Sequence, residues 1–262
     1  MLNVELLTNG KCNPIGVQPD CVKFSWRYPA ESSQFQQKAY RILASTKKRM
    51  LKNATADLWD SGWVESADNL NIPSGISAYP AMEPIYWTVC LRDADGAVYT
   101  SRPASFVVQP KRWKAKWIWK NNEIHVNDVA GFKKEFALED SVDYAYLCVS
   151  AHSQYKIWVN GCQVGGYVSP APTTPKNDKR FLGFDVKPFL CVGKNRIEAV
   201  AIYQGGSGQN FVDGKPGFFC ETHIQIGKKH VCIATGEDWL NSGSTPYESG
   251  MPYQQNRRIT AV

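Results

Sequence analysis

The chain has 262 residues, of which 43% are hydrophobic and 21% are charged, and its formal net charge is +6. These values describe a globular chain with enough apolar surface for one large or two ordinary cores, and they exclude wholesale disorder. No apolar run is long enough to cross a bilayer, so no membrane partner is expected. The N-terminal residues lack a basic region followed by an apolar core, which predicts no signal peptide. The location therefore stays open between the cytoplasm and a periplasmic or extracellular compartment.

Basic residues cluster at 47–49, 111–120 and 176–180. The middle cluster alternates with tryptophans, a pattern that also occurs in nucleic-acid-binding proteins. No nucleic-acid module surrounds it, and acidic residues are spread through both flanks. We therefore interpret the clusters as solvated faces and expect no nucleic-acid partner.

Cysteines are frequent but lack the spacing of a metal ribbon or a redox motif, because none forms a C-x-x-C pair. They are Cys12, Cys21, Cys90, Cys148, Cys162, Cys191, Cys220 and Cys232. Several fall inside predicted strands, where a reduced thiol acts as a small apolar core residue. We favour reduced thiols, and a disulfide such as Cys12 to Cys21 stays open.

Residues 1–109 consist of short alternating segments separated by turn clusters, with one weakly helical stretch at 47–56. The clearest strand, 84–92, is followed by the turn Asp93-Ala-Asp-Gly96 and a returning strand at 98–108. About seven short strands without a long helix predict an immunoglobulin-like sandwich.

Residues 110–130 form a predicted linker rich in tryptophan. Its charges and indoles indicate a segment that packs against its neighbours and does not swing freely. Trp113 and Trp117 are accordingly predicted to take part in domain docking.

The second predicted domain, 131–236, is organised around the region between residues 144 and 202. Tyr155, Ile157 and Val159 alternate with polar or outward positions, as in a strand with one buried face. Asn160-Gly161 supplies a tight hairpin turn. Trp158 lies on the opposite face and is a third docking candidate. We predict a second β-sandwich over 131–236, followed by a polar extension at 237–262 that has no terminating element, so whether the native chain continues stays open.

At this point a family resemblance emerges from specific segments. Lys23-Phe-Ser-Trp-Arg27 and Asp57-Leu-Trp-Asp-Ser-Gly62 resemble the N-terminal fibronectin type III-like module of bacterial α-L-rhamnosidases. Tyr155-Lys-Ile-Trp-Val-Asn-Gly161 and Phe184-Asp-Val186 are similar to the β-sandwich that follows it in that family, which implies a galactose-binding-like jelly roll for 131–236. The overall fold class is thus two β-sandwiches in tandem, all β.

The resemblance implies a non-catalytic accessory region of a glycoside hydrolase that supports the catalytic barrel. In that family an inverting pair of carboxylates lies in a later α/α toroid, and no such helical pattern occurs here. We therefore assign no catalytic residue and expect no activity from this chain alone. The alternative is a stand-alone carbohydrate-binding or structural, adhesive protein. The implied partners are the catalytic domain of the same polypeptide and a carbohydrate such as a rhamnose-containing glycan.

No cofactor or metal is expected from motifs. The family resemblance would allow a calcium ion, but Asp93-Ala-Asp-Gly96 fails as a calcium loop because Ala97 and Ala104 stand at ligand positions. The four histidines are scattered and form no His-Glu-x-x-His motif, which argues against a zinc hydrolase.

Sugar binding has a physical basis in the loops beside the second sandwich, where aromatic faces and polar groups gather. The candidates are Tyr167, Asn177, Asp178, Arg180, Tyr203, Gln204 and Asn210. The competing interpretation is that the tyrosines pack the rim of the sandwich and the polar residues face water. The family's Gly-Trp turn after Ala201 is replaced in this chain by residues 203–210, which weakens any inherited ligand contact there.

Overall fold

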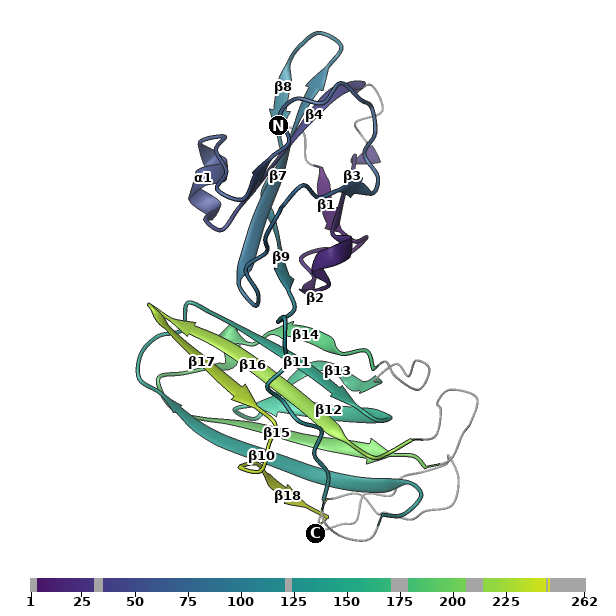
Figure 1. The fold of residues 1–262 in the computed structure, drawn as a ribbon, viewed down its shortest axis with the longest axis vertical. Coiled ribbons are helices and arrows are strands. Elements are labelled where there is room, and N and C mark those ends of the chain that lie inside the picture. Colours follow the sequence, from purple (N-terminus) through teal and green to yellow (C-terminus); the bar gives the residue numbers. More distant parts are fainter. Residues whose placement is uncertain are drawn as a thin grey trace. The chain divides into compact units, whose positions relative to one another are not determined.

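The computed structural model describes residues 4–30, 35–120, 124–170, 179–205, 214–243 and 245, with the backbone alone at 167–170. The chain divides into two compact units, Met1–Lys111 and Arg112–Val262 (Figure 1). Within the described part of the chain, no helix has the length and hydropathy that a membrane span requires.

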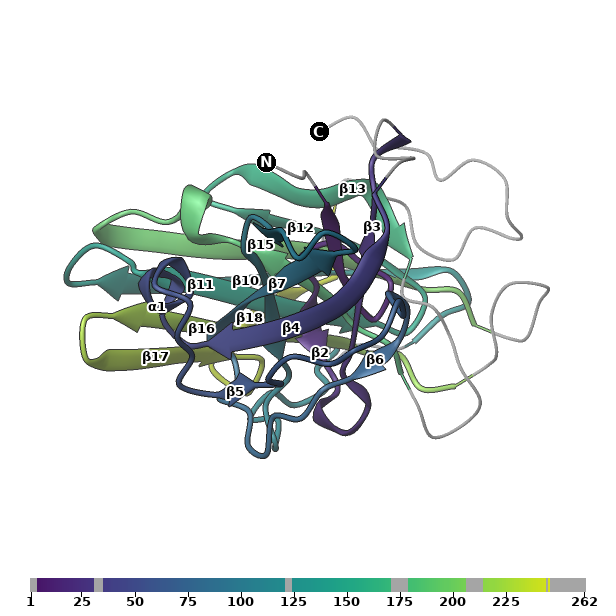
Figure 2. The same ribbon diagram turned by 90° about the horizontal axis from the view of Figure 1, so that it is seen from above.

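Unit 1 is a sandwich of two sheets. The larger sheet contains β2 (Ile15–Val17), β9 (Ala104–Val108), β7 (Pro84–Asp93), β4 (Gln37–Ser45) and β5 (Trp59–Asp60), with β8 (Val98–Thr100) paired to β7. The smaller sheet contains β1 (Glu5–Thr8), β3 (Lys23–Arg27) and β6 (Ile72–Pro73). The long strands β4 and β7 lie side by side in antiparallel register (Figure 2).

The core of unit 1 is aromatic. Phe24, Trp26, Trp87 and Phe106 are fully buried between the sheets, and the rings of Phe24 and Trp87 lie 4.4 Å apart. Such rings bury large apolar areas and favour tilted or edge contacts. The short helices α1 (Lys48–Lys52) and η1 (Pro19–Cys21) are peripheral, and α1 falls within the stretch predicted to be weakly helical. The predicted immunoglobulin-like sandwich is confirmed.

Unit 2 is also built from two antiparallel sheets (Figure 1). One contains β13 (Cys162–Pro170), β12 (Gln154–Val159), β15 (Gly193–Tyr203), β10 (Asp128–Leu138) and β18 (Leu240–Ser242). The other contains β14 (Leu182–Asp185), β11 (Tyr144–Ala151), β16 (Phe218–Ile226) and β17 (Lys229–Ala234). A short 3-10 helix, η3 (Lys187–Phe189), follows β14.

The alternation in β12 places its side chains as predicted. Tyr155, Ile157 and Val159 are at most 1% exposed, while Trp158 points away from the core. The turn to β13 uses Asn160 (φ 51°) and Gly161 (φ 81°), the left-handed pair that a tight antiparallel hairpin requires. The all-β fold with two sandwiches is confirmed.

The segment predicted as a linker is largely part of unit 2. The backbone N–H of Lys116 donates to Thr235 O at 2.8 Å, and Ile118 forms an isolated bridge with Phe218. Strand β10 begins at Asp128, earlier than the predicted start at residue 131, and β18 lies within the predicted extension. Both differences arise from long-range pairing: β10 continues along β15, and β18 joins the edge of β10.

Candidate functional site

The structure describes three of the seven residues that the sequence predicted to contact sugar. Arg180, Tyr203 and Gln204 fall within the described residues. The side chain of Tyr167 and the residues Asn177, Asp178 and Asn210 lie outside them. The structure therefore describes only part of the predicted rim.

Tyr203 and Gln204 meet the turn between β11 and β12. The ring of Tyr203 lies 4.9 Å from that of buried His152, and its hydroxyl donates to Gly214 O at 2.8 Å. The backbone N–H of Gln204 donates to Ser153 Oγ at 3.1 Å. These contacts order the rim, and a sugar contact at these residues stays a prediction.

Arg180 lies beside the same turn but is exposed. Its carbonyl accepts a hydrogen bond from Ser150 Oγ at 2.7 Å, and the preceding Lys179 donates through Nζ to His152 O at 3.2 Å. The main-chain contact anchors this segment to β11, and a sugar contact of the exposed Arg180 side chain stays a prediction.

A buried ion pair fixes the start of β10. Lys120 Nζ lies 2.5 Å from Asp128 Oδ1, with side-chain exposures of 7% and 0%. Asp128 Oδ1 also accepts the N–H of Val129, and Oδ2 accepts Trp119 Nε1–H at 3.4 Å. Charges this deeply buried persist only when paired and hydrogen-bonded. The pair therefore attaches the segment before β10 to the sandwich.

Trp113 and Trp117 pack within unit 2. The Trp113 ring contacts Phe181 at 4.9 Å and Phe219 at 5.3 Å between centroids. Trp117 lies 5.4 Å from the same Phe219 and remains 47% exposed. Their docking to another domain stays a prediction, whereas their packing on Phe219 is a structural fact.

Trp158 stands over the outer face of the five-stranded sheet. Its register partner on β15 is Glu198, which in turn pairs with Lys133 on β10, and Leu240 of β18 follows in the same row. These four residues line a groove of ≈ 420 Å³. A half-buried indole beside a carboxylate and an ammonium group can pack against an apolar partner or against a sugar ring.

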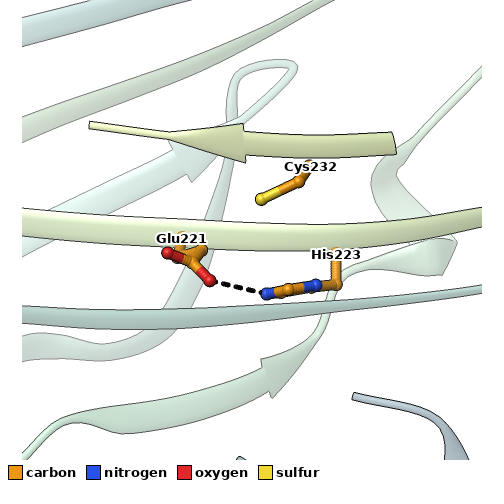
Figure 3. Close-up of side chains that lie close together, drawn as sticks. All are labelled: Glu221, His223 and Cys232. Carbon is orange, nitrogen blue, oxygen red and sulfur yellow. Dashed lines mark hydrogen bonds and ion pairs between the residues drawn. The ribbon is translucent and has the colours of Figure 1, made fainter. Parts of the chain in front are cut away.

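A second cluster lies on β16 and β17 and was missed from the sequence. Glu221 and His223 point toward one another, and Cys232 extends from β17 toward the same space (Figure 3). His223 Nε2 lies 2.7 Å from Glu221 Oε1, and His223 Nδ1 lies 3.1 Å from His230 Nε2. The spacing Glu-x-His on one strand and His-x-Cys on its partner was the available signal.

Glu221 also holds the segment before β10. Its Oε2 accepts the backbone N–H groups of Lys114 and Ala115 at 2.6 and 2.7 Å. Burial raises the pKa of this carboxyl, but the hydrogen bonds from His223 and from the two backbone groups outweigh it and lower the pKa overall. Glu221 is therefore a buried carboxylate that anchors main chain.

Together these features define a class: a tandem of β-sandwiches, of which the second holds the segment before β10 through buried carboxylates and presents a groove beside an indole. Comparison with known proteins gives the family. Residues 3–109 match the Rha78A-like N-terminal immunoglobulin domain, and residues 140–256 match the α-L-rhamnosidase N-terminal domain. Both matches place the chain among the N-terminal domains of α-L-rhamnosidases.

Individual relatives agree with this assignment. An α-L-rhamnosidase of Formosa agariphila is 27% identical over 79% of this chain and 24% of its own length. One of Streptomyces avermitilis is 26% identical over 89% of this chain and again 24% of its own length. The chain thus spans about a quarter of the curated relatives that it matches.

Solved structures show the same fold. The α-L-rhamnosidase from Dictyoglumus thermophilum superposes with a TM-score of 0.80 at 21% identity, covering 92% of this chain and 30% of that one. The enzyme from Aspergillus terreus gives a TM-score of 0.78 at 21% identity, covering 95% and 30%. These superpositions show that the fold of this chain also occurs in those two enzymes.

Proposed function

We propose that this chain is the non-catalytic accessory region of an α-L-rhamnosidase-like glycoside hydrolase, which supports the catalytic domain and contacts carbohydrate. The observation that carries the proposal is the pair of N-terminal domain matches in sequence order. The relatives from Formosa agariphila and Streptomyces avermitilis are α-L-rhamnosidases, and this chain covers 24% of the length of each.

The electrostatics of the carboxyl groups support a non-catalytic role. A glycosidase acid must hold its proton near neutral pH, which requires a raised pKa. Among the described residues, the carboxyls with a shifted pKa are all lowered, because hydrogen bonds and nearby cations outweigh burial. They are Asp57, Asp60, Glu135, Glu221 and Asp238. The fully buried Asp128 and Glu221 hold main chain or an ammonium group.

Two features of unit 2 favour a role in supporting a catalytic domain: a segment that is fixed to the sandwich and an indole on its outer face. The segment at 113–120 is fixed to unit 2 by the Glu221 and Asp128 anchors. The groove at Trp158 leaves an indole accessible on the outer face of the sheet. A rigid module with such a surface suits packing against a further domain or stacking on a pyranose ring.

The first test is hydrolysis. The purified chain is incubated with an aryl α-L-rhamnoside, and no release of the aryl group above the buffer rate is expected. Turnover that copurifies with the chain would overturn the non-catalytic assignment. Reading the gene downstream of the Val262 codon then separates the accessory region from the stand-alone alternative: a continuing frame with a helical toroid supports the former, and a stop codon supports the latter.

The carbohydrate role is tested by calorimetric titration with rhamnose and a rhamnose-containing oligosaccharide. Trp158→Ala should weaken binding at least about tenfold, or about 1.4 kcal/mol. Trp63→Ala is the matched control, because Trp63 is an exposed indole, 38% accessible, in unit 1. Equal losses in both variants, or no binding by the wild type, would remove carbohydrate contact at Trp158 from the proposal.

A further inference from the structure

The β16–β17 hairpin brings together three different donor types. Glu221 and His223 alternate with core-facing Cys220 and Ile224, so they share the face of β16 that points away from the core. The register pairs His223 with Cys232 on β17. One carboxylate oxygen, one imidazole nitrogen and one sulfur therefore lie within 4.8 Å of one another.

One oxygen of the Glu221 carboxylate is held by main chain, and the other contacts only the neighbouring candidate ligand His223. Glu221 Oε2 accepts two backbone N–H groups, from Lys114 and Ala115. Oε1 contacts His223 Nε2 at 2.7 Å. The group is 0% exposed, so the two backbone bonds orient it before any cation arrives. Such prior orientation of a ligand is what outer-sphere hydrogen bonds provide in metal sites.

The imidazole has an orienting partner on its other nitrogen. Without a metal, His223 Nε2–H donates to Glu221 Oε1, and His223 Nδ1 accepts from His230 Nε2–H across 3.1 Å. With a metal on Nε2, the proton of His223 moves to Nδ1, which donates to His230 Nε2, and His230 carries its proton on Nδ1. Each ring keeps one proton. His230 is thus placed to fix the orientation of the His223 ring in both states.

The thiol supplies the soft donor. Cys232 is not in a disulfide, and like an ordinary cysteine it carries a thiol near neutral pH when no metal is bound. Metal binding replaces that proton, which passes to solvent. The resulting thiolate and the Glu221 carboxylate neutralise a divalent cation.

We propose that Glu221, His223 and Cys232 form a Zn²⁺ site, with His230 as a positioning residue. Zinc accepts mixed sulfur, nitrogen and oxygen ligands, whereas calcium and magnesium prefer oxygen alone. Zinc bonds of about 2.0–2.3 Å put tetrahedral ligands roughly 3.3 Å apart, so the Glu221–His223 contact must open by about 0.6 Å. The fourth position would take water.

Such a site joins three segments of unit 2. The cation would link β16 to β17 directly, and Glu221 would link both to the segment at 114–115 through its second oxygen. Zinc would therefore stabilise the connection between the segment before β10 and the sheet, in addition to the hairpin itself.

The site is tested by titrating the chelator-treated chain with Zn²⁺ in a calorimeter and with Co²⁺ in a spectrophotometer. One equivalent of Zn²⁺ should bind, and Co²⁺ should give a sulfur-to-metal charge-transfer band with tetrahedral d–d absorption. Cys232→Ser should abolish the band and weaken Zn²⁺ at least about a hundredfold, and His230→Ala should weaken it about 10- to 100-fold.

The matched control is Cys191→Ser, since Cys191 is an exposed thiol on a different segment. It should leave both titrations unchanged. The melting temperature of each metal-free variant shows whether the fold is retained. Glu221→Gln is a second variant that removes the carboxylate ligand and keeps the attachment of main chain, because an amide oxygen still accepts the backbone N–H groups. No binding by the wild type, or a band that survives Cys232→Ser, would overturn the proposal. Neither result bears on hydrolysis or sugar binding.

Discussion

The buried pair of Lys120 and Asp128 offers the sharpest test of how unit 2 is held together. In Asp128→Ala, the ammonium group of Lys120, whose side chain is 7% exposed, loses the carboxylate that lies 2.5 Å away. The backbone N–H of Val129 and the indole N–H of Trp119 lose their acceptor as well. Removing one member of a buried pair costs about 3–5 kcal/mol. For a unit of this size, that corresponds to a fall in melting temperature of roughly 6–20 °C.

The assay is differential scanning calorimetry of the whole chain, supported by urea unfolding followed through tryptophan fluorescence. The double variant Lys120→Met with Asp128→Leu removes both charges and should recover at least about 2 kcal/mol relative to Asp128→Ala, because an apolar pair leaves no orphaned charge. A loss below about 1 kcal/mol in the single variant, or no recovery in the double, would refute the reasoning.

Three other outcomes are expected. Gly75→Ala should destabilise unit 1 by about 1–3 kcal/mol in urea unfolding, since an added Cβ would lie 2.3 Å from the β5 indole nitrogen; an unchanged midpoint would contradict this. The hydrogen bond from Arg41 lowers the pKa of Asp60 in the folded state, so the ionised Asp60 stabilises the fold above its unfolded pKa of about 4. This stabilisation is lost as the pH falls through the lower folded pKa, and Asp60→Asn should therefore make the free energy of unfolding less dependent on pH in this acidic range. Because burial raises the pKa of Cys232 to about 11, iodoacetamide should modify exposed Cys191 first, as read by peptide mass spectrometry; preferential labelling of Cys232 would contradict the burial argument.

Local patterns predicted most of the fold. The alternation of Tyr155, Ile157 and Val159 and the turn at Asn160-Gly161 depend on neighbours in sequence, so the strand, its buried face and its hairpin follow from the residues alone. The aromatic motifs of unit 1 carried the family resemblance for a similar reason, because they are contiguous. The resemblance supplied the function class, which the strand pattern could not.

The candidate sites depended on pairing that the sequence shows only indirectly. Glu221, His223 and Cys232 meet because β16 and β17 pair in one particular register, and a slip of one residue would turn Cys232 to the other face. The tryptophan-rich segment was predicted to pack, but its position on Phe219 and its backbone bonds to Glu221 involve residues about a hundred positions away. The loops at the rim of the second sandwich carry no periodic pattern, so the residues predicted there to contact sugar were selected only for the chemistry of their side chains.

The contact between Glu221 and the segment before β10 has a consequence for sequence variation. The Glu221 carboxylate accepts hydrogen bonds from the backbone N–H groups of Lys114 and Ala115, and the side chains of these two residues take no part in the bonds. Homologous chains can therefore change both residues freely and keep the attachment, with proline as the one residue that removes a donor. We therefore expect Glu221 and the length of the segment before β10 to be conserved among homologous chains, while the residue types at positions 114 and 115 vary.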